Sequence, residues 1–445
     1  MSLDRKTFLR HLGTGALGLA ATGSLRADTP DLDGGARAPR GLNRRGAQVP
    51  PLSWPVFDPK KADEFWREVR ALFPLKDEPL YLNTGGLGPA SQPVLDKVEA
   101  VSRELQEHSE TGHELLGVAR GSVARFLGAK PEELCFVRNA TEANSIIAAG
   151  LALAAGDEVI FETHAHPGGS FPWLNQARRR GVVVRLFEPD PESAGGNLAR
   201  IRELISPRTK VIQVSHLTCT TGLAFPVDEI AALARSRGIW FHIDGAQSAG
   251  MVPINLAAIG CDSFAFSGHK WLGGPHETGG LFIRRDRLEA VALVCTGAYS
   301  GNLSRLPGEI ELFDAASRHE YGTRNAGLAS GLAEAARLQE HLGRDRIAAH
   351  GRELAAMIAD GLAGVAGLTV LTPKPAALRG SIVTFRHERA DAEKLFGYLM
   401  KNHGLRCRPV TEQGLDAIRV SPHVFTSRAD AERVIVAGRA AAKDL

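Results

Sequence analysis

The central part of the chain alternates between short apolar runs and helical patterns. Six of these runs are strand-like, and they lie at 134–137, 158–161, 182–186, 211–214, 239–243 and 263–266. Because alternation of this kind makes each helix a crossover between parallel strands, it predicts an α/β fold with a mainly parallel sheet between helices. A further run, 280–283, follows the sixth so closely that we expect an antiparallel, hairpin-like strand.

The pattern changes after Asn325, and this change indicates a second domain. A long Ala-, Leu- and Glu-rich helix is predicted at 327–343 and another up to about 363, followed by strands near 368–371 and 381–386. We therefore expect a large domain over 80–326 and a smaller α+β domain over 327–445. Upstream, the apolar spacing of 61–73 predicts an amphipathic helix within the segment 60–79.

The N-terminus has the pattern of an export signal. Arg5-Lys6-Thr7-Phe8-Leu9-Arg10 precedes a weakly apolar, Gly- and Ala-rich stretch at 12–25, which resembles a twin-arginine signal with Arg-Lys in place of Arg-Arg. The stretch is too short to span a bilayer, for which about 20 apolar residues are needed. We expect a signal peptide over 1–27, a flexible linker over 28–59, and export to the periplasm; the alternative is a cytoplasmic protein with a disordered leader.

Charge and cysteine usage exclude several classes of partner. The net charge is +3 and both signs are interspersed along the chain, which argues against nucleic acid or an acidic membrane surface as a partner. The five cysteines have no pairing motif, and no Cys/His spacing is typical of zinc, so no metal is expected.

Polar residues follow five of the strand-like runs directly. In open α/β sheets, ligands bind beyond the carboxyl ends of the strands, so we expect these groups to meet in one crevice. The segments are Arg138-Asn139-Ala140-Thr141-Glu142, Thr163-His164-Ala165-His166, Ser215-His216, Asp244-Gly245-Ala246-Gln247 and Ser267-Gly268-His269-Lys270.

Lys270 and Asp244 together indicate a pyridoxal 5′-phosphate (PLP) site. A lysine can form a Schiff base with the cofactor, and an acid on a neighbouring strand can hold the proton on the pyridine nitrogen, so that the ring accepts electrons from the substrate Cα. Ala140 and Thr141 open a predicted helix, whose backbone amides can hold the phosphate.

These motifs carry a resemblance to a known family. From about residue 80 to 325, and again at Ile418-Arg419-Val420-Ser421-Pro422-His423, the chain resembles the class V aminotransferases, which are fold type I PLP enzymes and include cysteine desulfurases and isopenicillin N epimerase. The resemblance implies the fold type I arrangement of a large PLP-binding domain and a small C-terminal domain.

The resemblance also implies a role for each cofactor-binding residue. Lys270 would carry the cofactor and later move the Cα proton, Asp244 would pair with the pyridine nitrogen, and Gln247 would contact the phenolic oxygen. Thr141, Ser267 and His269 would bind phosphate. His164 would stack on the ring, with His166 as the alternative.

For the substrate and the partner subunit, the family implies a second set. Arg419 would bind the α-carboxylate, a task suited to a guanidinium fork. Arg408 is a candidate second arginine, and Asn83 and Gly85 would line the substrate entrance. The remaining two, Thr323 and Thr278, would reach the phosphate of the other subunit's cofactor, which implies a homodimer.

Two departures bear on the reaction. Cysteine desulfurases carry a catalytic cysteine on the loop that corresponds to 409–418, which contains none here; Cys407 lies before it. Desulfurase activity is therefore not expected. Cys219 replaces an asparagine that desulfurases tend to have beside the ring. The short loop and the His-x-His-Pro segment resemble the isopenicillin N epimerase branch.

We therefore expect an enzyme that acts on an α-amino acid, or on a metabolite or peptide derived from one, by removing the Cα proton. Aminotransferase is the first expectation. An epimerase or racemase is the alternative, because both reactions need the same groups and differ only in where the proton returns. A C–S or β-eliminating lyase is a second alternative, and a non-catalytic protein with a PLP fold is a third.

Overall fold

The computed structural model describes residues 54–302, 306 and 308–445. The predicted signal peptide and the greater part of the predicted linker lie outside these residues, so export stays a prediction. Within the described residues, no helix has the length and apolar character needed to cross a membrane.

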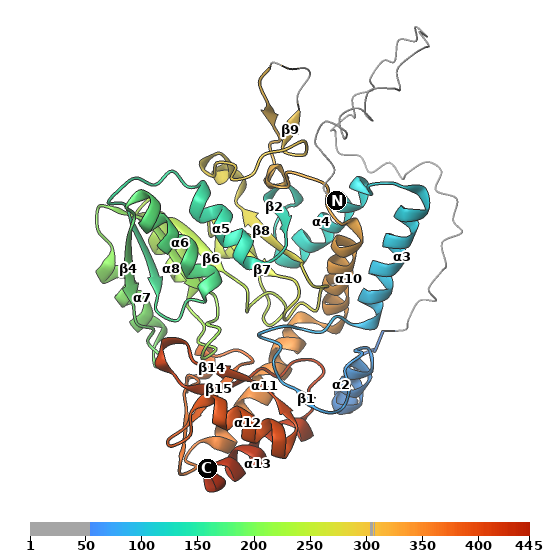
Figure 1. Cartoon of the computed structure of the whole chain (residues 1–445), viewed down its shortest axis with the longest axis vertical. Coiled ribbons are helices and arrows are strands. Elements are labelled where there is room, and N and C mark those ends of the chain that lie inside the picture. Colours follow the sequence, from blue (N-terminus) through green and yellow to red (C-terminus); the bar gives the residue numbers. More distant parts are fainter. Residues whose placement is uncertain (1–53, 303–305, 307) are drawn as a thin grey trace, which may run out of the picture. The chain divides into compact units, whose positions relative to one another are not determined.

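The described elements follow one another along the chain as shown in Figure 1. The helices are Ala62–Ala71 (α2), Gln92–His108 (α3), His113–Leu127 (α4), Ala140–Gly150 (α5), Pro167–Arg180 (α6), Ala194–Leu204 (α7), Val227–Ser236 (α8), Leu256–Ile259 (α9), Ala326–Leu342 (α10), Arg344–Leu362 (α11), Ala392–His403 (α12) and Arg428–Asp444 (α13). The strands are Leu80–Tyr81 (β1), Leu134–Val137 (β2), Glu158–Glu162 (β3), Val183–Phe187 (β4), Thr209–Ser215 (β5), Trp240–Asp244 (β6), Ser263–Ser267 (β7), Gly279–Ile283 (β8), Gly301–Asn302 (β9), Glu311–Leu312 (β10), Leu368–Val370 (β11), Val383–His387 (β12), Leu405–Arg406 (β13), Arg408–Val410 (β14) and Ala417–Val420 (β15).

A seven-stranded sheet forms the centre of the large domain, in the order β2-β8-β7-β6-β5-β3-β4. The pairs from β4 through β3, β5 and β6 to β7 are all parallel. Strand β8 runs antiparallel to both β7 and β2. The α/β fold class and the antiparallel strand predicted at 280–283 are therefore confirmed.

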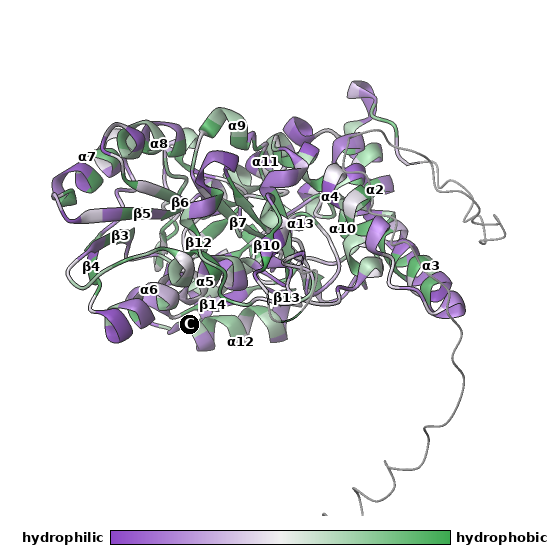
Figure 2. Cartoon of the chain, turned by 90° about the horizontal axis from the view of Figure 1, so that it is seen from above, coloured by the Kyte–Doolittle hydropathy of each residue, from purple (hydrophilic) through white to green (hydrophobic). Residues whose placement is uncertain are grey.

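Side chains that alternate along each strand build two cores, one on each face of this sheet. In β7, Phe264 and Phe266 join the core formed with α4, α8 and α10, whereas Ala265 joins the core formed with α5 and Trp173 of α6. Figure 2 shows the hydrophobic colour of β7 between the helices and the hydrophilic colour of α7 at the edge. Burial on both faces explains why these strands are nearly continuous apolar runs.

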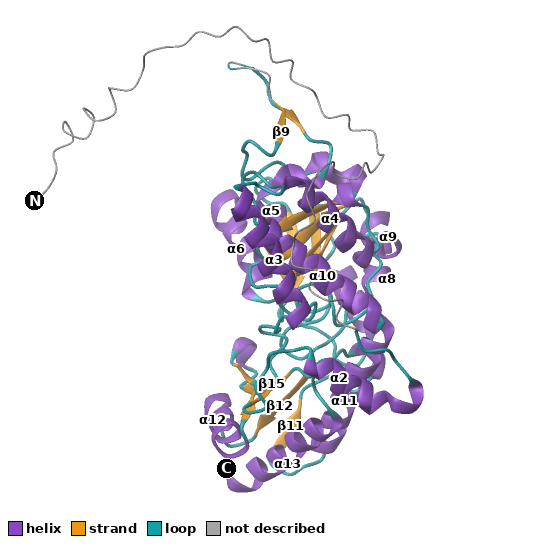
Figure 3. Ribbon diagram, turned by 90° about the vertical axis from the view of Figure 1, so that its right-hand side faces the viewer, coloured by secondary structure: helices purple, strands orange, loops and turns teal. Residues whose placement is uncertain are grey.

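A four-stranded antiparallel sheet, in the order β11-β12-β15-β14, forms the centre of the C-terminal part. It packs against α11, α12 and α13, which Figure 3 shows around it. Arg408 and Arg419 are direct partners across β14 and β15, so their side chains leave the same face of this sheet.

The N-terminal described segment packs against the C-terminal part, which the predicted boundaries did not anticipate. Residue 80 was predicted to begin the large domain, but strand β1, which begins there, pairs in parallel with β13. Phe65 and Val69 of α2 share a core with Phe425. Phe57, predicted to belong to a flexible linker, packs edge-on against Phe65. The last residues of the predicted linker therefore pack against the protein, and Phe57 is half-buried by a contact with the N-terminal helix.

Candidate active site

The carboxyl ends of the central strands open into a cavity of about 250 Å³. Most of the predicted site residues line it, and they come from both the large domain and the four-stranded sheet. They are Gly85, Ala140, Thr141, Asp244, Gln247, Ser267, His269, Lys270, Arg408 and Arg419. The cavity is also lined by Gly86, Asn139, Asn144, His166, Gly168, Cys219 and Ala246.

Lys270 lies in the turn that directly follows β7. Burial lowers the pKa of Lys270, and the guanidinium groups of Arg419 and Arg408 lower it further, against the raising effect of Asp244. A depressed pKa provides the uncharged amine that a Schiff base requires. The turn is held from outside by Gly88, whose N–H donates to the His269 carbonyl at 2.8 Å.

Asp244 ends β6 and is buried. Its Oδ1 accepts from the Ala246 amide at 3.0 Å, and its Oδ2 accepts from Nδ2 of Asn144 at 2.9 Å. Each oxygen therefore has one donor and keeps a further lone pair. This carboxylate has the free acceptor capacity needed to hold a proton on a ring nitrogen.

The first turn of α5 forms an anion-binding end of the cavity. The Ala140 amide donates to Oγ of Ser267 at 3.1 Å, which leaves the Ser267 hydroxyl proton available. Thr141 and His269 line the same end, and Nδ1 of His269 is buried without a partner. Burial lowers the pKa of His269, and the neighbouring Lys270 lowers it further. A helix N-terminus with free hydroxyl groups is a favourable phosphate site.

Gln247 is tied to the protein on both sides of its amide. Its Nε2 donates to the Gly85 carbonyl at 2.9 Å, and its Oε1 accepts from the Trp271 indole at 2.7 Å. One N–H of Gln247 therefore stays free, so its predicted contact with a phenolic oxygen remains a prediction.

Arg419 joins three segments at the cavity wall. Its guanidinium donates to the Cys219 carbonyl and to Oδ1 of Asn83, each at 2.8 Å, and its Nε is buried without a partner. Burial, together with the neighbouring charge of Arg408, lowers the pKa of Arg419 to about 10. Asn83 does not line the cavity; it holds Arg419 instead of reaching the substrate entrance.

Arg408 forms an ion pair with Glu412, a residue that the sequence did not single out. The pair partly neutralises Arg408 at the cavity wall. Sequence reasoning missed Glu412 because an acid four residues beyond an arginine is common in solvated loops, and only the fold turns it toward the site.

The structure favours His166 over His164 for the ring-stacking position. His166 lines the cavity, and its Nδ1 accepts from the Gly168 amide at 2.9 Å as the cap of α6. His164 does not line it. The ring of His164 lies against Thr220 at 3.1 Å and Glu188 at 3.4 Å. The preference for His164 is corrected because the first histidine after β3 still lies in the turn, whereas the second begins the helix that faces the cavity.

Thr278 and Thr323 lie outside this cavity. Both line a neighbouring cavity of about 260 Å³ together with Arg138, Glu277 and Tyr321. Their expected contact with a partner subunit's phosphate stays a prediction.

Cys407 lies in the core of the C-terminal part, away from the cavity. It is buried, its Sγ lies 3.9 Å from the Leu405 carbonyl, and burial raises its pKa to about 12. A thiol in this position has no access to a ligand beside Lys270.

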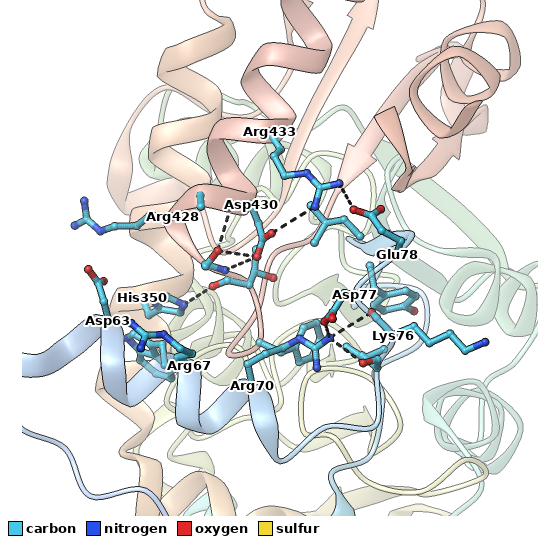
Figure 4. Close-up of a pocket in the computed structure, with 18 of the residues that line it drawn as sticks. Asp63, Arg67, Arg70, Lys76, Asp77, Glu78, His350, Arg428, Asp430 and Arg433 are labelled. Carbon is cyan, nitrogen blue, oxygen red and sulfur yellow. Dashed lines mark hydrogen bonds and ion pairs between the residues drawn. The ribbon is translucent and has the colours of Figure 1, made fainter. Parts of the chain in front are cut away.

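A larger cavity of about 590 Å³ lies elsewhere, between α2, the segment 75–81 and the start of α13 (Figure 4). Several of its charged groups are paired within the protein, including Arg433 with Glu78 at 2.8 Å and Arg70 with Asp77 at 3.3 Å. Neither Lys270 nor Asp244 lines it. The smaller cavity is therefore the candidate active site, because it is the one of these two that Lys270 and Asp244 line.

Among the described residues, no group of three His, Cys, Asp or Glu side chains is arranged to hold a metal ion.

Asn144 also lines the cavity and was not singled out in the sequence. It lies one helical turn after Thr141. The sequence predicted that a helix starts at Ala140 and Thr141, but not which of its side chains would contact Asp244.

Comparison with known proteins places this geometry among relatives. The Aminotransferase class-V family profile matches residues 90–434. Isopenicillin N epimerase of Amycolatopsis lactamdurans is 30% identical over 390 residues, covering 83% of this chain and 96% of that protein. The apo structure of a cysteine desulfurase from Thermococcus onnurineus NA1 superposes with a TM-score of 0.77 at 25% identity, covering 85% of this chain and 98% of that one. A C-DES variant with glycine covalently linked to its PLP cofactor has a TM-score of 0.76 at 24% identity, covering 83% and 98% of the two chains.

Proposed function

Because the chain belongs to the class-V aminotransferase family, whose cofactor is PLP, we propose that it is an aminotransferase acting on an α-amino acid or a compound derived from one. The observation that carries the proposal is one cavity lined by a lysine with a lowered pKa, a buried aspartate and a buried arginine. This set contains a nucleophilic amine, a partner for a ring nitrogen and a partner for a carboxylate.

The residues present fit the cofactor. PLP needs an amine, an acid for its ring nitrogen and donors for its phosphate, and these needs match Lys270, Asp244 and the first turn of α5 with Ser267. The unpartnered Nδ1 of His269 is a further polar atom at the phosphate end. When bound, PLP supplies the electron sink that makes the substrate Cα proton acidic.

The chain's own residues then have separate tasks. Arg419 binds the α-carboxylate and so orients the substrate. Lys270 would take the proton from Cα and would return it to the cofactor carbon on the other side of the substrate nitrogen. His166 covers the ring face, and Asp244 holds the ring-nitrogen proton. One amine serves both proton transfers, so transamination needs no second base.

Epimerisation is the second candidate, and one observation favours it. A proton donor on the opposite side of Cα would favour inversion, and Cys219 lines the same cavity as Lys270. Burial raises the pKa of Cys219, so the thiol keeps its proton. The similarity to isopenicillin N epimerase points the same way.

A single-turnover reaction in D₂O tests the proposal. The PLP-loaded protein would be mixed with a panel of amino acids, and cofactor absorbance and product mass would be read together. We expect the cofactor to end in its pyridoxamine form with a keto acid released. Deuterium at an inverted Cα with the cofactor unchanged would establish an epimerase. Release of pyruvate or sulfide with the cofactor unchanged would establish a lyase.

Two controls make this experiment decisive. Lys270→Ala should abolish turnover, because the proton-transfer group is lost. Cys219→Ala should retain transamination, but it should lose inversion if the thiol is the second proton donor. A wild-type protein that bound PLP and reacted with no amino acid, free or within a peptide, would contradict the proposal.

We also propose that the protein is a homodimer. Thr278 and Thr323 line a cavity of their own, which would face the partner's cofactor in such a dimer. Light scattering of the loaded protein should give twice the chain mass, whereas a monomer with full activity would contradict this.

A further inference from the structure

We propose that Asn144 is a positioning residue that orients the Asp244 carboxylate toward the cofactor nitrogen, and that Trp240, Ser263 and His242 fix the orientation of its amide. The proposal rests on PLP being held as described above, but not on which reaction follows. It concerns residues behind the cavity, of which only Asn144 lines it.

The four side chains form a continuous row of hydrogen bonds behind Asp244. The Trp240 indole lies 2.9 Å from Oγ of Ser263, and that oxygen lies 2.8 Å from Nδ1 of His242. His242 Nε2 lies 2.8 Å from Oδ1 of Asn144, whose Nδ2 lies 2.9 Å from Oδ2 of Asp244. All five side chains are buried, so water does not compete for these bonds.

The chemistry of the two ends fixes the direction of every proton in the row. A carboxylate and a backbone carbonyl can only accept, so Nδ2 of Asn144 donates to Asp244 and Gly168, and its Oδ1 accepts from Nε2 of His242. In the neutral ring, Nδ1 of His242 then has no proton and accepts. The Ser263 hydroxyl, which accepts from the Trp240 indole, donates to it. Burial lowers the pKa of His242 to about 4, which keeps the ring neutral, as this arrangement requires.

Asn144 also ties Asp244 to the helix that carries His166. The second proton on its Nδ2 goes to the Gly168 carbonyl at 3.1 Å, in the first turn of α6. A methyl group on Gly169 would lie only 2.8 Å from Oδ2 of Asp244, so the backbone of α6 runs close to the carboxylate. One amide therefore sets the distance between the residue at the ring nitrogen and the residue at the ring face.

Asp244 can rotate about its side-chain bonds unless both oxygens are held. The Ala246 amide holds one, and Asn144 holds the other with a bond to a charged acceptor, which is the stronger kind of neutral-donor hydrogen bond. Without Asn144, Oδ2 of Asp244 loses its donor. The expected result is a misaligned Asp244 and a weaker hold on the ring-nitrogen proton.

The test compares Asn144→Ala, Ser263→Ala and Ser145→Ala, each loaded with PLP labelled with ¹⁵N in the ring. Ser145 is the matched control, because it lies on the same helix and its hydroxyl bonds only to the Thr141 carbonyl at 2.8 Å. Solid-state NMR would report whether the ring nitrogen is protonated. Steady-state kinetics would give kcat and KM for the amino donor, and thermal melting would report folding.

For Asn144→Ala we expect the ¹⁵N signal to move toward the unprotonated position and kcat to fall about 10- to 100-fold, the worth of a hydrogen bond to a charged group. KM for the amino donor should stay unchanged, because Asn144 does not bind the substrate carboxylate. Ser263→Ala should move the ¹⁵N signal and kcat in the same direction but by less, with kcat falling about 2- to 5-fold. The reason is that His242 loses the donor that fixes its tautomer, whereas Asp244 keeps its own hydrogen bonds. Ser145→Ala should match the wild type.

An unchanged ¹⁵N signal in folded Asn144→Ala would overturn the proposal. If that variant does not fold, Ser263→Ala decides, and a wild-type signal there would overturn it. A wild-type protein that shows no signal from bound cofactor would instead contradict the proposed function. The failure of the inference and the failure of the proposed function therefore give different results.

Discussion

At the scale of single residues, the site contains residues whose own chemistry acts on a ligand and residues that hold those side chains in place. Lys270, Asp244 and Arg419 are of the first kind, whereas Asn83 and Asn144 orient two of these three. Sequence motifs predicted the residues of the first kind, since their chemistry needs particular side chains. Asn144 was missed and Asn83 was given another role, because an asparagine that hydrogen-bonds another side chain belongs to no recognisable sequence motif.

The two histidines after β3 give a direct residue-scale prediction. His166→Ala should weaken PLP binding and change the visible spectrum of the bound cofactor, because the ring face loses its cover. His164→Ala is the matched control and should bind PLP like the wild type, since His164 lies against Thr220 and Glu188. PLP titration followed by absorbance would measure both. If His164→Ala weakened PLP binding more than His166→Ala did, His164 would be the residue that covers the ring, as the sequence predicted.

At the scale of elements, the turn after β7 depends on a close backbone approach. A Cβ at Gly88 would lie 1.9 Å from the Lys270 carbonyl oxygen, and the backbone there cannot yield as a flexible side chain does. The loop 83–89 therefore sets the position of the lysine turn, although the two are far apart in the sequence.

Gly88→Ala should accordingly destabilise the protein by about 1–3 kcal/mol, the usual cost of overpacking, and should lower PLP content. Gly121→Ala in α4 is the control, because an added Cβ there meets nothing within 4 Å. It should be neutral, or stabilising by about 0.5–1 kcal/mol, through the helix preference of alanine. Urea unfolding and cofactor content would be measured for both. Equal effects of the two substitutions would show that the close approach is not a constraint.

The elements themselves were largely predictable from sequence. Strands such as β2 and β7 are buried on both faces, so their apolar runs predicted them to within a residue at either end. The pairing of β1 with β13 was not predicted, because a two-residue strand carries no signal for a partner more than three hundred positions away. Phe57 packs against Phe65 of α2, whereas composition alone suggested a linker.

At the scale of the whole molecule, buried histidines determine the response to acid. Burial lowers the pKa of His242, His319, His350 and His423 to about 4. Their unfolded-state pKa is about 6.5. Between these values the unfolded chain binds more protons than the folded one, so the stability that these groups contribute is present above pH 6.5 and is lost as the pH falls toward 4.

Glu162 contributes with the opposite sign. Burial raises the pKa of Glu162 to about 7, so its contribution is present in acid and is lost as the pH rises through 7. Urea midpoints from pH 4.5 to 8 should therefore fall steeply on the acid side. Glu162→Gln should gain stability relative to the wild type at pH 8 but not at pH 5. A midpoint that stays level from pH 6.5 to 4.5 would contradict the account of the histidines.

The central claim is that Lys270 carries the cofactor in a cavity built for amino-acid chemistry. The most direct measurement is borohydride reduction of the PLP-loaded protein, followed by proteolysis and mass spectrometry. The account predicts one modified peptide, with the cofactor mass on Lys270, and no modified peptide in Lys270→Ala. Recovery of the cofactor on another lysine, or no covalent attachment in the wild type, would contradict it.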